Sequence, residues 1–125
     1  MNIETELDQI LAELGMNSLG EKRDFAWLKE GILLAIRYPN TWQDRYLELI
    51  GKREGITRER VRQILYKAVW DGWNIQSAFI LNNHFGHPIQ TQFEYVRPNH
   101  IEIIALLSEE LREKYQIKYL KRIKC

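Results

Sequence analysis

Apolar residues recur every third or fourth position along most of the chain, the spacing that gives an α-helix one buried stripe. The first two series are Ile3, Leu7, Ile10, Leu11 and Leu14, followed by Phe25, Leu28, Ile32 and Ile36. The first stops at Gly15, a residue type that commonly ends helices. The second must end near Tyr38, because the residue before Pro39 is disfavoured in a helix. Two helices joined by a polar link at residues 17–23 are therefore expected.

A third and a fourth helix are predicted on either side of a glycine-containing turn. Thr41 and Asp44 resemble a capping box, and the helix that they open carries Trp42, Tyr46, Leu49 and Ile50. Gly51 permits a close approach of the backbone, and Gly55 permits a tight turn. Thr57 then caps a helix that runs to about Gly72. This order of helix, short turn and helix is typical of a helix-turn-helix.

The last part of the chain predicts two more helices. A short apolar piece at residues 75–81 indicates a fifth helix, and Asn99 with Glu102 forms a capping box before the stripe Ile101, Ile104, Leu107 and Leu111. Residues 89–95 alternate loosely, but a single strand would have no partner, so an extended loop is expected there. The prediction is an all-α fold, a compact six-helix domain at residues 1–116 that contains the helix-turn-helix, followed by a basic tail at 117–125.

The helix that begins after Thr57 has two unlike sides when its residues are placed about 100° apart. Its core-facing stripe spans about 100° and consists of Val61, Ile64, Leu65 and Ala68. The opposite arc spans about 140° and consists of Arg58, Glu59, Arg62, Gln63 and Tyr66. Arg60 and Lys67 lie on its flank. The pattern predicts one buried side and one side free to meet a ligand.

The exposed side carries side chains that can read DNA bases, because Arg donates to guanine, Gln pairs with adenine and a carboxylate accepts from cytosine. The residues predicted to face base edges are Arg58, Glu59, Arg60, Arg62 and Gln63, with Arg60 shared between bases and backbone. The residues predicted to contact phosphates are Lys52, Arg53, Thr57, Tyr66 and Lys67. The alternative is a solvated helix face without a ligand, but paired Arg and Gln beside a turn favour a recognition helix.

The composition is that of one folded domain, because 125 residues with 45% hydrophobic content can bury a core of their own. No apolar run approaches the roughly 20 residues that span a bilayer, and the acidic N-terminus does not resemble a signal peptide. The single cysteine, Cys125, has no partner for a disulfide. These features predict a cytoplasmic protein without membrane contact.

Net charge is only +1, but the charges are unevenly distributed. The first predicted helix is acidic, with Glu4, Glu6, Asp8 and Glu13. Residues 51–67 hold six basic side chains against two acidic ones, and residues 111–125 hold six against one. Two basic regions can meet DNA even when the net charge is near zero.

Other chemistry is weakly indicated. No nucleophile–base pair, glycine-rich phosphate loop or pair of carboxylates stands out, so neither an enzyme nor a cofactor is expected. Asn83, His84 and His87 come nearest to a metal site, but no third ligand of suitable spacing exists, and no metal is predicted. Trp27 and Trp42 are expected in the core, whereas Trp70 lies near the polar arc and is interpreted as a dimer contact. The basic tail suits either a solvated chain end or an extension that binds phosphates or a partner.

One local resemblance concerns residues 51–64, which read GKREGITRERVRQI. This segment resembles the promoter-reading helix-turn-helix of housekeeping sigma factors. The resemblance implies that Arg58, Glu59 and Gln63 touch bases, and that Arg60 and Arg62 hold backbone or bases. It covers about 20 residues and lapses after Ala68, where Trp70-Asp71-Gly72-Trp73 replaces the basic end of that family's helix.

A second resemblance extends from about residue 7 to residue 115. It is carried by pieces in a fixed order: ILAELG (10–15), WLKEGI (27–32), RV (60–61) with Ala68 and Trp73, FG (85–86), PNHIEIIA (98–105) and ELR (110–112). The ordered set resembles the C-terminal, DNA-binding effector domain of the stage-zero sporulation response regulator of endospore-forming bacteria. The resemblance implies a six-helix domain that binds DNA as a tandem, head-to-tail pair. The likeness to sigma factors is then interpreted as convergent use of a good recognition helix.

The chain departs from the sporulation family in two respects. Of the family's base-contacting positions Arg60 matches, but the Glu and Arg that follow are here Arg62 and Gln63. A different DNA target is therefore expected, because an acceptor that favours cytosine has become a donor that favours guanine, and Gln favours adenine. The family's regulators also carry an N-terminal receiver with a phosphorylated Asp. These 125 residues hold no such domain, so control by phosphorylation in cis is not expected.

The sequence thus predicts a transcription regulator that binds double-stranded DNA in a sequence-specific way and lacks a phosphoacceptor receiver domain. It is expected to bind as a tandem homodimer. The alternative is a protein-interaction module that pairs with a full-length regulator or with RNA polymerase and does not read DNA alone. A small repressor of a phage or mobile element is a third interpretation.

Overall fold

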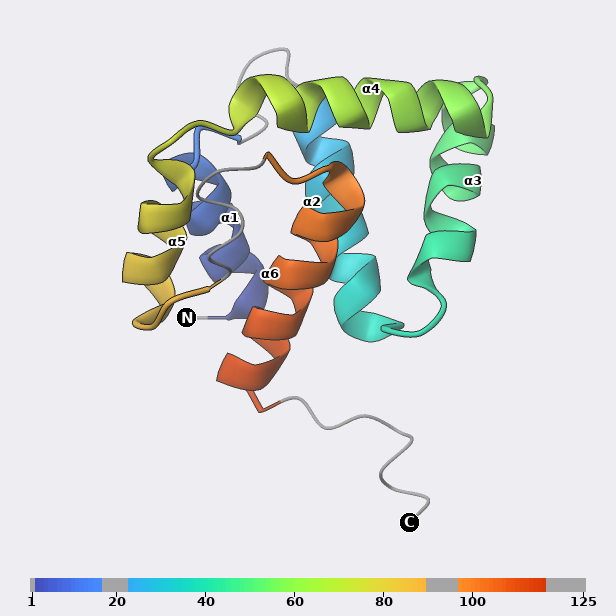
Figure 1. Cartoon of the computed structure of the whole chain (residues 1–125). Helices are drawn as coiled ribbons and strands as arrows, with labels where there is room; N and C mark the ends of the chain where they lie inside the picture. The colour runs from blue at the N-terminus through green and yellow to red at the C-terminus, as the bar shows by residue number, and fades with distance from the viewer. Residues whose placement is uncertain (1, 17–22, 90–96, 117–125) are drawn as a thin grey trace.

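A computed structural model describes residues 2–16, 23–89 and 97–116, and in these ranges the chain forms six helices and no strand (Figure 1). The helices are α1 (Ile3–Glu13), α2 (Arg23–Arg37), α3 (Trp42–Glu54), α4 (Arg58–Gly72), α5 (Ser77–Phe85) and α6 (His100–Lys114). The prediction of an all-α, six-helix domain is confirmed. The basic tail at 117–125 and most of the predicted links at 17–23 and 89–95 lie outside the described residues.

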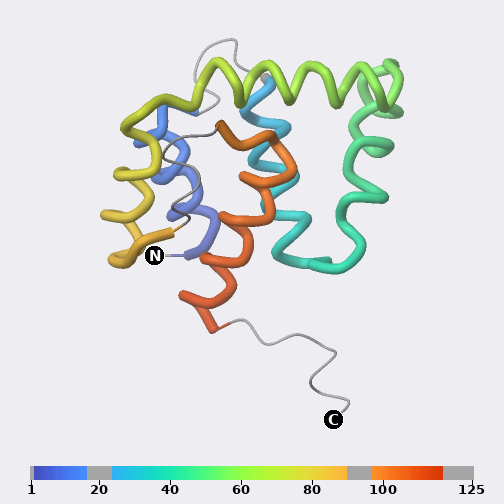
Figure 2. The backbone as a smooth tube through the Cα atoms, in the orientation of Figure 1, coloured from blue at the N-terminus to red at the C-terminus, as the bar shows by residue number. Residues whose placement is uncertain are grey.

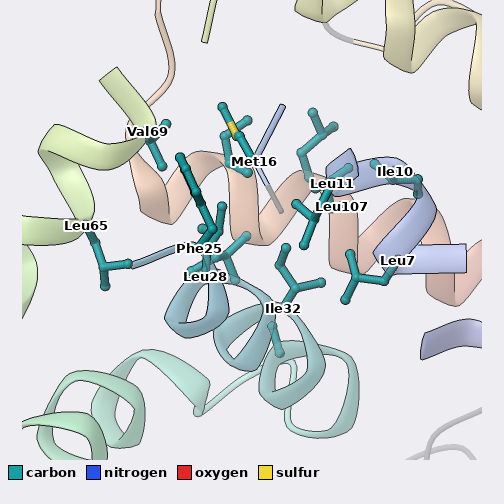
Figure 3. Close-up of a cluster of buried hydrophobic side chains, with 14 of the residues drawn as sticks. Leu7, Ile10, Leu11, Met16, Phe25, Leu28, Ile32, Leu65, Val69 and Leu107 are labelled. Atoms are coloured by element: carbon teal, nitrogen blue, oxygen red, sulfur yellow. The ribbon is translucent and has the colours of Figure 1, made fainter. Parts of the chain in front are cut away.

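Helix α2 lies at the centre and contacts α1, α3, α4 and α6. Helix α4 runs across the ends of α2, α3 and α6 along one side of the molecule, as the tube in Figure 2 also shows. Figure 3 shows the core between these elements, where apolar side chains of α1, α2, α4 and α6 converge. They include the fully buried Leu7, Ile32, Leu65 and Leu107. This core holds α4 by one side and leaves its other side at the surface.

Several predicted helix ends are confirmed. The Thr57 side chain accepts a hydrogen bond from the Arg60 backbone N–H at 3.0 Å, which begins α4. Asn99 and Glu102 make both hydrogen bonds of a capping box at the start of α6. The capping box at Thr41 and Asp44 is wrong, because Thr41 makes no side-chain capping bond. The Asp44 backbone N–H instead donates to the Thr41 carbonyl at 3.2 Å, so a backbone turn leads into α3.

The fifth helix begins and ends later than predicted. A turn occupies residues 74–77, in which the Asn74 N–H donates to Ser77 Oγ and Asn74 Oδ1 accepts from the Gln76 N–H. This turn satisfies backbone groups ahead of the helix, so α5 begins at Ser77 and leaves Ile75 outside, 73% exposed. The helix continues to Phe85 and ends at Gly86, whose φ is +79°.

Helices α3 and α4 are joined by three residues whose geometry depends on two glycines. Gly55 ends α3 with φ +74°, a left-handed conformation that costs other residues strain. A Cβ atom on Gly51 would lie 2.7 Å from the carbonyl oxygen of Ile56, so the turn can approach α3 only where no side chain stands. Both glycine predictions are confirmed, and the short turn sets the angle at which α4 leaves α3.

The Gly51→Ala variant is expected to lose about 1–3 kcal/mol of unfolding free energy, because its Cβ meets backbone that cannot turn aside. Gly72→Ala is the matched control. Its Cβ would meet the Met16 side chain at 3.1 and 3.2 Å and the Phe25 ring at 3.4 Å, so a smaller loss is expected, because side chains can shift where backbone cannot. Urea unfolding followed by circular dichroism measures both variants. Equal stability of the two would contradict the role given to the Gly51 contact.

Candidate nucleic-acid interface

All ten residues predicted to contact DNA are exposed. Seven lie on α4, and we call these seven the polar face of α4: Arg58, Glu59, Arg60, Arg62, Gln63, Tyr66 and Lys67. Thr57 caps the same helix, and Lys52 with Arg53 lies in the last turn of α3 just before the connecting turn. The fold therefore gathers the predicted residues on and beside one helix.

The buried side of α4 differs from the predicted stripe. Val61, Leu65 and Val69 are fully buried, whereas Ile64 and Ala68 are only half-buried. At about 100° per residue, this turns the outward direction by about 50°, to a line between Gln63 and Lys67. Arg60 and Lys67, which were predicted on the flank, point outward beside Gln63, and Arg62 moves to a flank. Arg58 falls about 20° from the centre of the buried stripe, and it is exposed as the first residue of the helix. The cause is that α4 packs on α2, α3 and α6 together rather than on one partner.

Two of the predicted base-reading residues bind each other. Arg62 Nε donates to Glu59 Oε1 at 3.0 Å, and Arg62 Nη2 donates to Glu59 Oε2. The hydrogen bond from Arg62 lowers the pKa of Glu59, and the hydrogen bond to Glu59 raises the pKa of Arg62. The pair is exposed, so it can exchange one partner for a base edge at small cost.

Arg53 is exposed but is already paired with two carboxylates of the protein itself, Glu30 and Glu54. Its Nη1 and Nη2 atoms donate to both oxygens of Glu30 at 2.9 and 3.0 Å, and its Nε donates to Glu54. These bonds raise the pKa of Arg53, with the hydrogen bond to Glu30 as the main cause. A two-pronged pair between α3 and α2 positions the turn that precedes α4. Arg53 would have to give up this pair to bind a phosphate.

The other basic side chains at this surface are Lys52, Lys67, Arg58 and Arg60, and each makes either a weak surface ion pair or none with a described residue. Lys67 Nζ lies 2.7 Å from Asp71, and Lys52 Nζ lies 3.6 Å from Glu48, with both lysines largely exposed. Such surface pairs exchange readily, because they contribute only about 0–1 kcal/mol. Within the described part of the chain, no carboxylate pairs with Arg58 or Arg60. The start of α4 is therefore the point where positive charge is most available.

A second feature of this surface lies at the end of α4 and was missed by sequence reasoning. The rings of Tyr66 and Trp70 stack, with centroids 6.1 Å apart and planes 13° apart. The Arg97 guanidinium lies over the Trp70 ring, 4.6 Å from its centroid. Arg97 Nη1 also donates a hydrogen bond to the Trp70 carbonyl oxygen at 2.8 Å. Arg97 precedes α6 and is 27 residues from Trp70, so no local sequence signal links them. Trp70 is 45% exposed, as the dimer contact predicted for it requires.

The histidines considered as metal ligands are engaged with different carboxylates. His84 Nε2 lies 2.8 Å from Glu6, and His84 Nδ1 lies 3.2 Å from Glu13. His87 Nε2 lies 2.9 Å from Glu110. In residues 2–16, 23–89 and 97–116, no group of three or more His, Cys, Asp or Glu side chains is arranged to hold a metal ion.

Glu6, which the sequence shows only as one acidic residue of α1, is the centre of a buried polar cluster. It is 3% exposed and also accepts hydrogen bonds from Lys114 Nζ and the Tyr115 hydroxyl. Burial alone would raise the pKa of Glu6, but the bonds from Lys114, Tyr115 and His84 lower it to about 2. The cluster ties α1, α5 and α6 together on the side away from α4.

Comparisons of the chain with protein-family models, curated proteins and solved structures found no match. In the part of the chain that the structure describes, no helix has both the length and the apolar character needed to cross a membrane. Inferences about function therefore rest on the residues themselves.

Proposed function

We propose that the protein binds double-stranded DNA through the polar face of α4 and regulates transcription by reading sequence in the major groove. The observation that carries the proposal is the exposed start of α4, where Arg58 and Arg60 have no carboxylate partner among the described residues. This end of the helix follows α3 after a three-residue turn. Helix-turn-helix proteins present the start of their second helix to base edges in the same way.

The geometry supports a division of roles on the polar face. Arg58 and Arg60, which have no carboxylate partner among the described residues, can face base edges directly. Arg62 and Gln63 both hydrogen-bond Glu59 and join them when they leave it. Lys52, Lys67 and the Tyr66 hydroxyl suit phosphates, since their present partners are weak or absent. Arg53 differs, because its pair with Glu30 gives it a positioning role. The resemblances to sigma factors and to the sporulation effector domain support the same face and suggest a tandem pair on DNA in the cytoplasm.

The deciding experiment is selection of bound duplexes from a randomised DNA pool, followed by anisotropy titrations of the selected site at several salt concentrations. A regulator of this kind is expected to enrich one motif and to lose affinity steeply between about 50 and 200 mM salt. No enrichment and no shift at low salt would refute the proposal.

Arg62→Ala and Lys52→Ala are expected to act differently on the selected motif. Loss of Arg62 should relax the preference at one base pair by about 1–3 kcal/mol, because a guanine donor is removed. Loss of Lys52 should weaken binding to all sequences alike. It should also lower the slope of log affinity against log salt concentration by about 1. Binding profiles on the randomised pool measure both effects. Unchanged profiles in both variants would show that the polar face does not contact DNA.

A second candidate function is a protein-interaction module that pairs with a full-length regulator or RNA polymerase. The observation in its favour is the exposure of apolar side chains outside α4: Leu49 (48%) on α3, Phe79 (53%) on α5 and Ile75 (73%) just before α5. A protein of this kind would show no DNA shift at low salt and would still co-purify with a defined partner. The two functions are therefore separated by the same titration.

A further inference from the structure

The two ends of α4 carry positive charge held in different ways. At the start, Arg58 and Arg60 extend from the helix itself. At the end, the charge belongs to Arg97, which comes from the segment before α6 and lies over Trp70. Arg97 is exposed, and no described carboxylate pairs with it. No described residue therefore neutralises its positive charge at the surface that we propose to face DNA.

The position of Arg97 is fixed on two sides. The guanidinium carbon lies over the Trp70 ring, which itself stacks on Tyr66, and Nη1 donates a hydrogen bond to the Trp70 carbonyl. A guanidinium has five N–H donors, so four remain available. A guanidinium held at two points suits a phosphate, because less side-chain freedom is lost when the ligand binds. The arrangement resembles a prepared anion contact more closely than a loose surface side chain.

The spacing between the two charged ends fits the dimensions of DNA. Residues 58 and 70 are separated by about 18 Å along the helix axis, at about 1.5 Å per residue. The major groove is about 12 Å wide. When the start of α4 lies at base edges, a point about 18 Å further along its axis lies beyond the edge of the groove. The end of the helix is then beside one of the two sugar–phosphate backbones that border the groove.

We propose that Arg97, held on Trp70, binds a DNA phosphate on the border of the groove, so that the recognition helix is fixed by base contacts at its start and by a phosphate contact at its end. The inference rests on the proposed function and extends the interface beyond α4 to the segment before α6. It assigns Trp70 a role in orienting Arg97. Arg97 carries no base specificity, since phosphates are alike in all sequences.

Arg97 also has a purely structural role to be separated from this one. Its bond to the Trp70 carbonyl closes the end of α4, so its removal could lower stability without any contact to DNA. Unfolding experiments report the structural role of Arg97, and the salt dependence of DNA affinity reports its contact with a phosphate. A phosphate contact releases counterions and adds to the slope of log affinity against log salt, whereas a helix-end bond does not.

The experiment compares Arg97→Ala, Arg97→Lys and Arg37→Ala on the selected duplex and on a scrambled duplex. Arg37→Ala removes the same charge from an exposed position at the far end of α2 and serves as control. Arg97→Ala is expected to lower the salt slope by about 0.9 and the affinity at 0.1 M salt by about eightfold, equally on both duplexes. Arg97→Lys should keep the slope, because the charge remains, and recover most of the affinity.

Circular dichroism establishes that each variant is folded, and Arg97→Gln replaces Arg97→Ala if alanine prevents folding. A slope and affinity equal to those of Arg37→Ala, with wild-type protein binding normally, would overturn the Arg97 contact and leave the proposed function standing. A loss confined to the selected duplex would also overturn it, since that is the signature of a base contact. Failure of the wild-type protein to bind either duplex at low salt would overturn both proposals.

Discussion

Replacing both Arg58 and Arg60 by alanine is expected to reduce affinity for the selected duplex by at least about 30-fold, because each good base contact contributes about 1–3 kcal/mol. These are the arginines of α4 that need break no ion pair with a described residue before they meet DNA. Their side chains stand at the start of the helix, which enters the groove first in helix-turn-helix proteins. Removing them should therefore reduce affinity more than removing Arg62 does, because Arg62 must first give up its hydrogen bonds to Glu59.

The matched control is the double variant Arg37→Ala with Arg45→Ala, which removes the same charge from α2 and α3. Anisotropy titration at fixed salt compares the two double variants with wild type. Folding is checked by circular dichroism, and little change is expected, because both α4 arginines are exposed. If the α4 variant binds within about threefold of the control, the start of α4 is not the reading end of the helix.

Acidification from pH 6.5 to pH 4 is expected to cost about 3 kcal/mol of unfolding free energy through one residue, His100. His100 is the first residue of α6 and is 2% exposed. Among the described residues, neither ring nitrogen has a hydrogen-bond partner. Burial, and to a smaller extent the charge of Arg62, lowers the pKa of His100 from 6.5 to about 4.

The direction of the effect follows from proton binding. The unfolded chain takes up a proton on His100 as the pH falls through 6.5, whereas the folded protein takes it up only near pH 4. Between these values protons favour the unfolded chain, so stability present above pH 6.5 is lost as the pH falls. Below pH 4 the loss from this residue is complete.

His100→Leu provides the test, because leucine has a similar volume and cannot be protonated. The variant should lack the loss of about 3 kcal/mol that His100 causes between pH 6.5 and 4, measured by urea unfolding at each pH. It should also be at least as stable as wild type at pH 7, because unpaired buried nitrogens cost about 1–3 kcal/mol. Glu6, with its pKa near 2, should still produce a separate loss below pH 4.5 in both proteins. A variant that keeps the wild-type slope between pH 6.5 and 4 would contradict the assignment to His100.

Local sequence rules succeeded where a few neighbouring residues decide the structure. Thr57 caps α4, Asn99 and Glu102 form a capping box, and Gly51 and Gly55 fit the turn as predicted. The apolar series placed α1 and α2 correctly, because a stripe at helical spacing must be buried to stabilise the helix. The rules failed where competing local bonds existed, as in the turn that delays α5 past Ile75.

Local sequence rules could not predict contacts between residues that are far apart in the chain. The pairs Arg53–Glu30 and Arg97–Trp70 join residues 23 and 27 positions apart, and Glu6 meets side chains 78 to 109 positions away. Charge and aromatic character mark such residues as polar or exposed, but they do not name the partner. The partner depends on how the helices pack around α2.

The sequence by itself determined that the chain is a bundle of helices and which helix carries the exposed Arg, Glu and Gln, since periodicity and capping act within a few residues of chain. Only the tertiary structure decided which way α4 is turned. Because α2, α3 and α6 pack on it together, Val69 replaces Ile64 and Ala68 in the buried stripe. The same packing sets Arg62 to one flank, leaves Arg58 and Arg60 without a carboxylate partner among the described residues, and brings Arg97 onto Trp70. Rotation of a helix about its own axis changes none of its internal hydrogen bonds. The helices that pack against it therefore determine which of its faces stays exposed to a ligand.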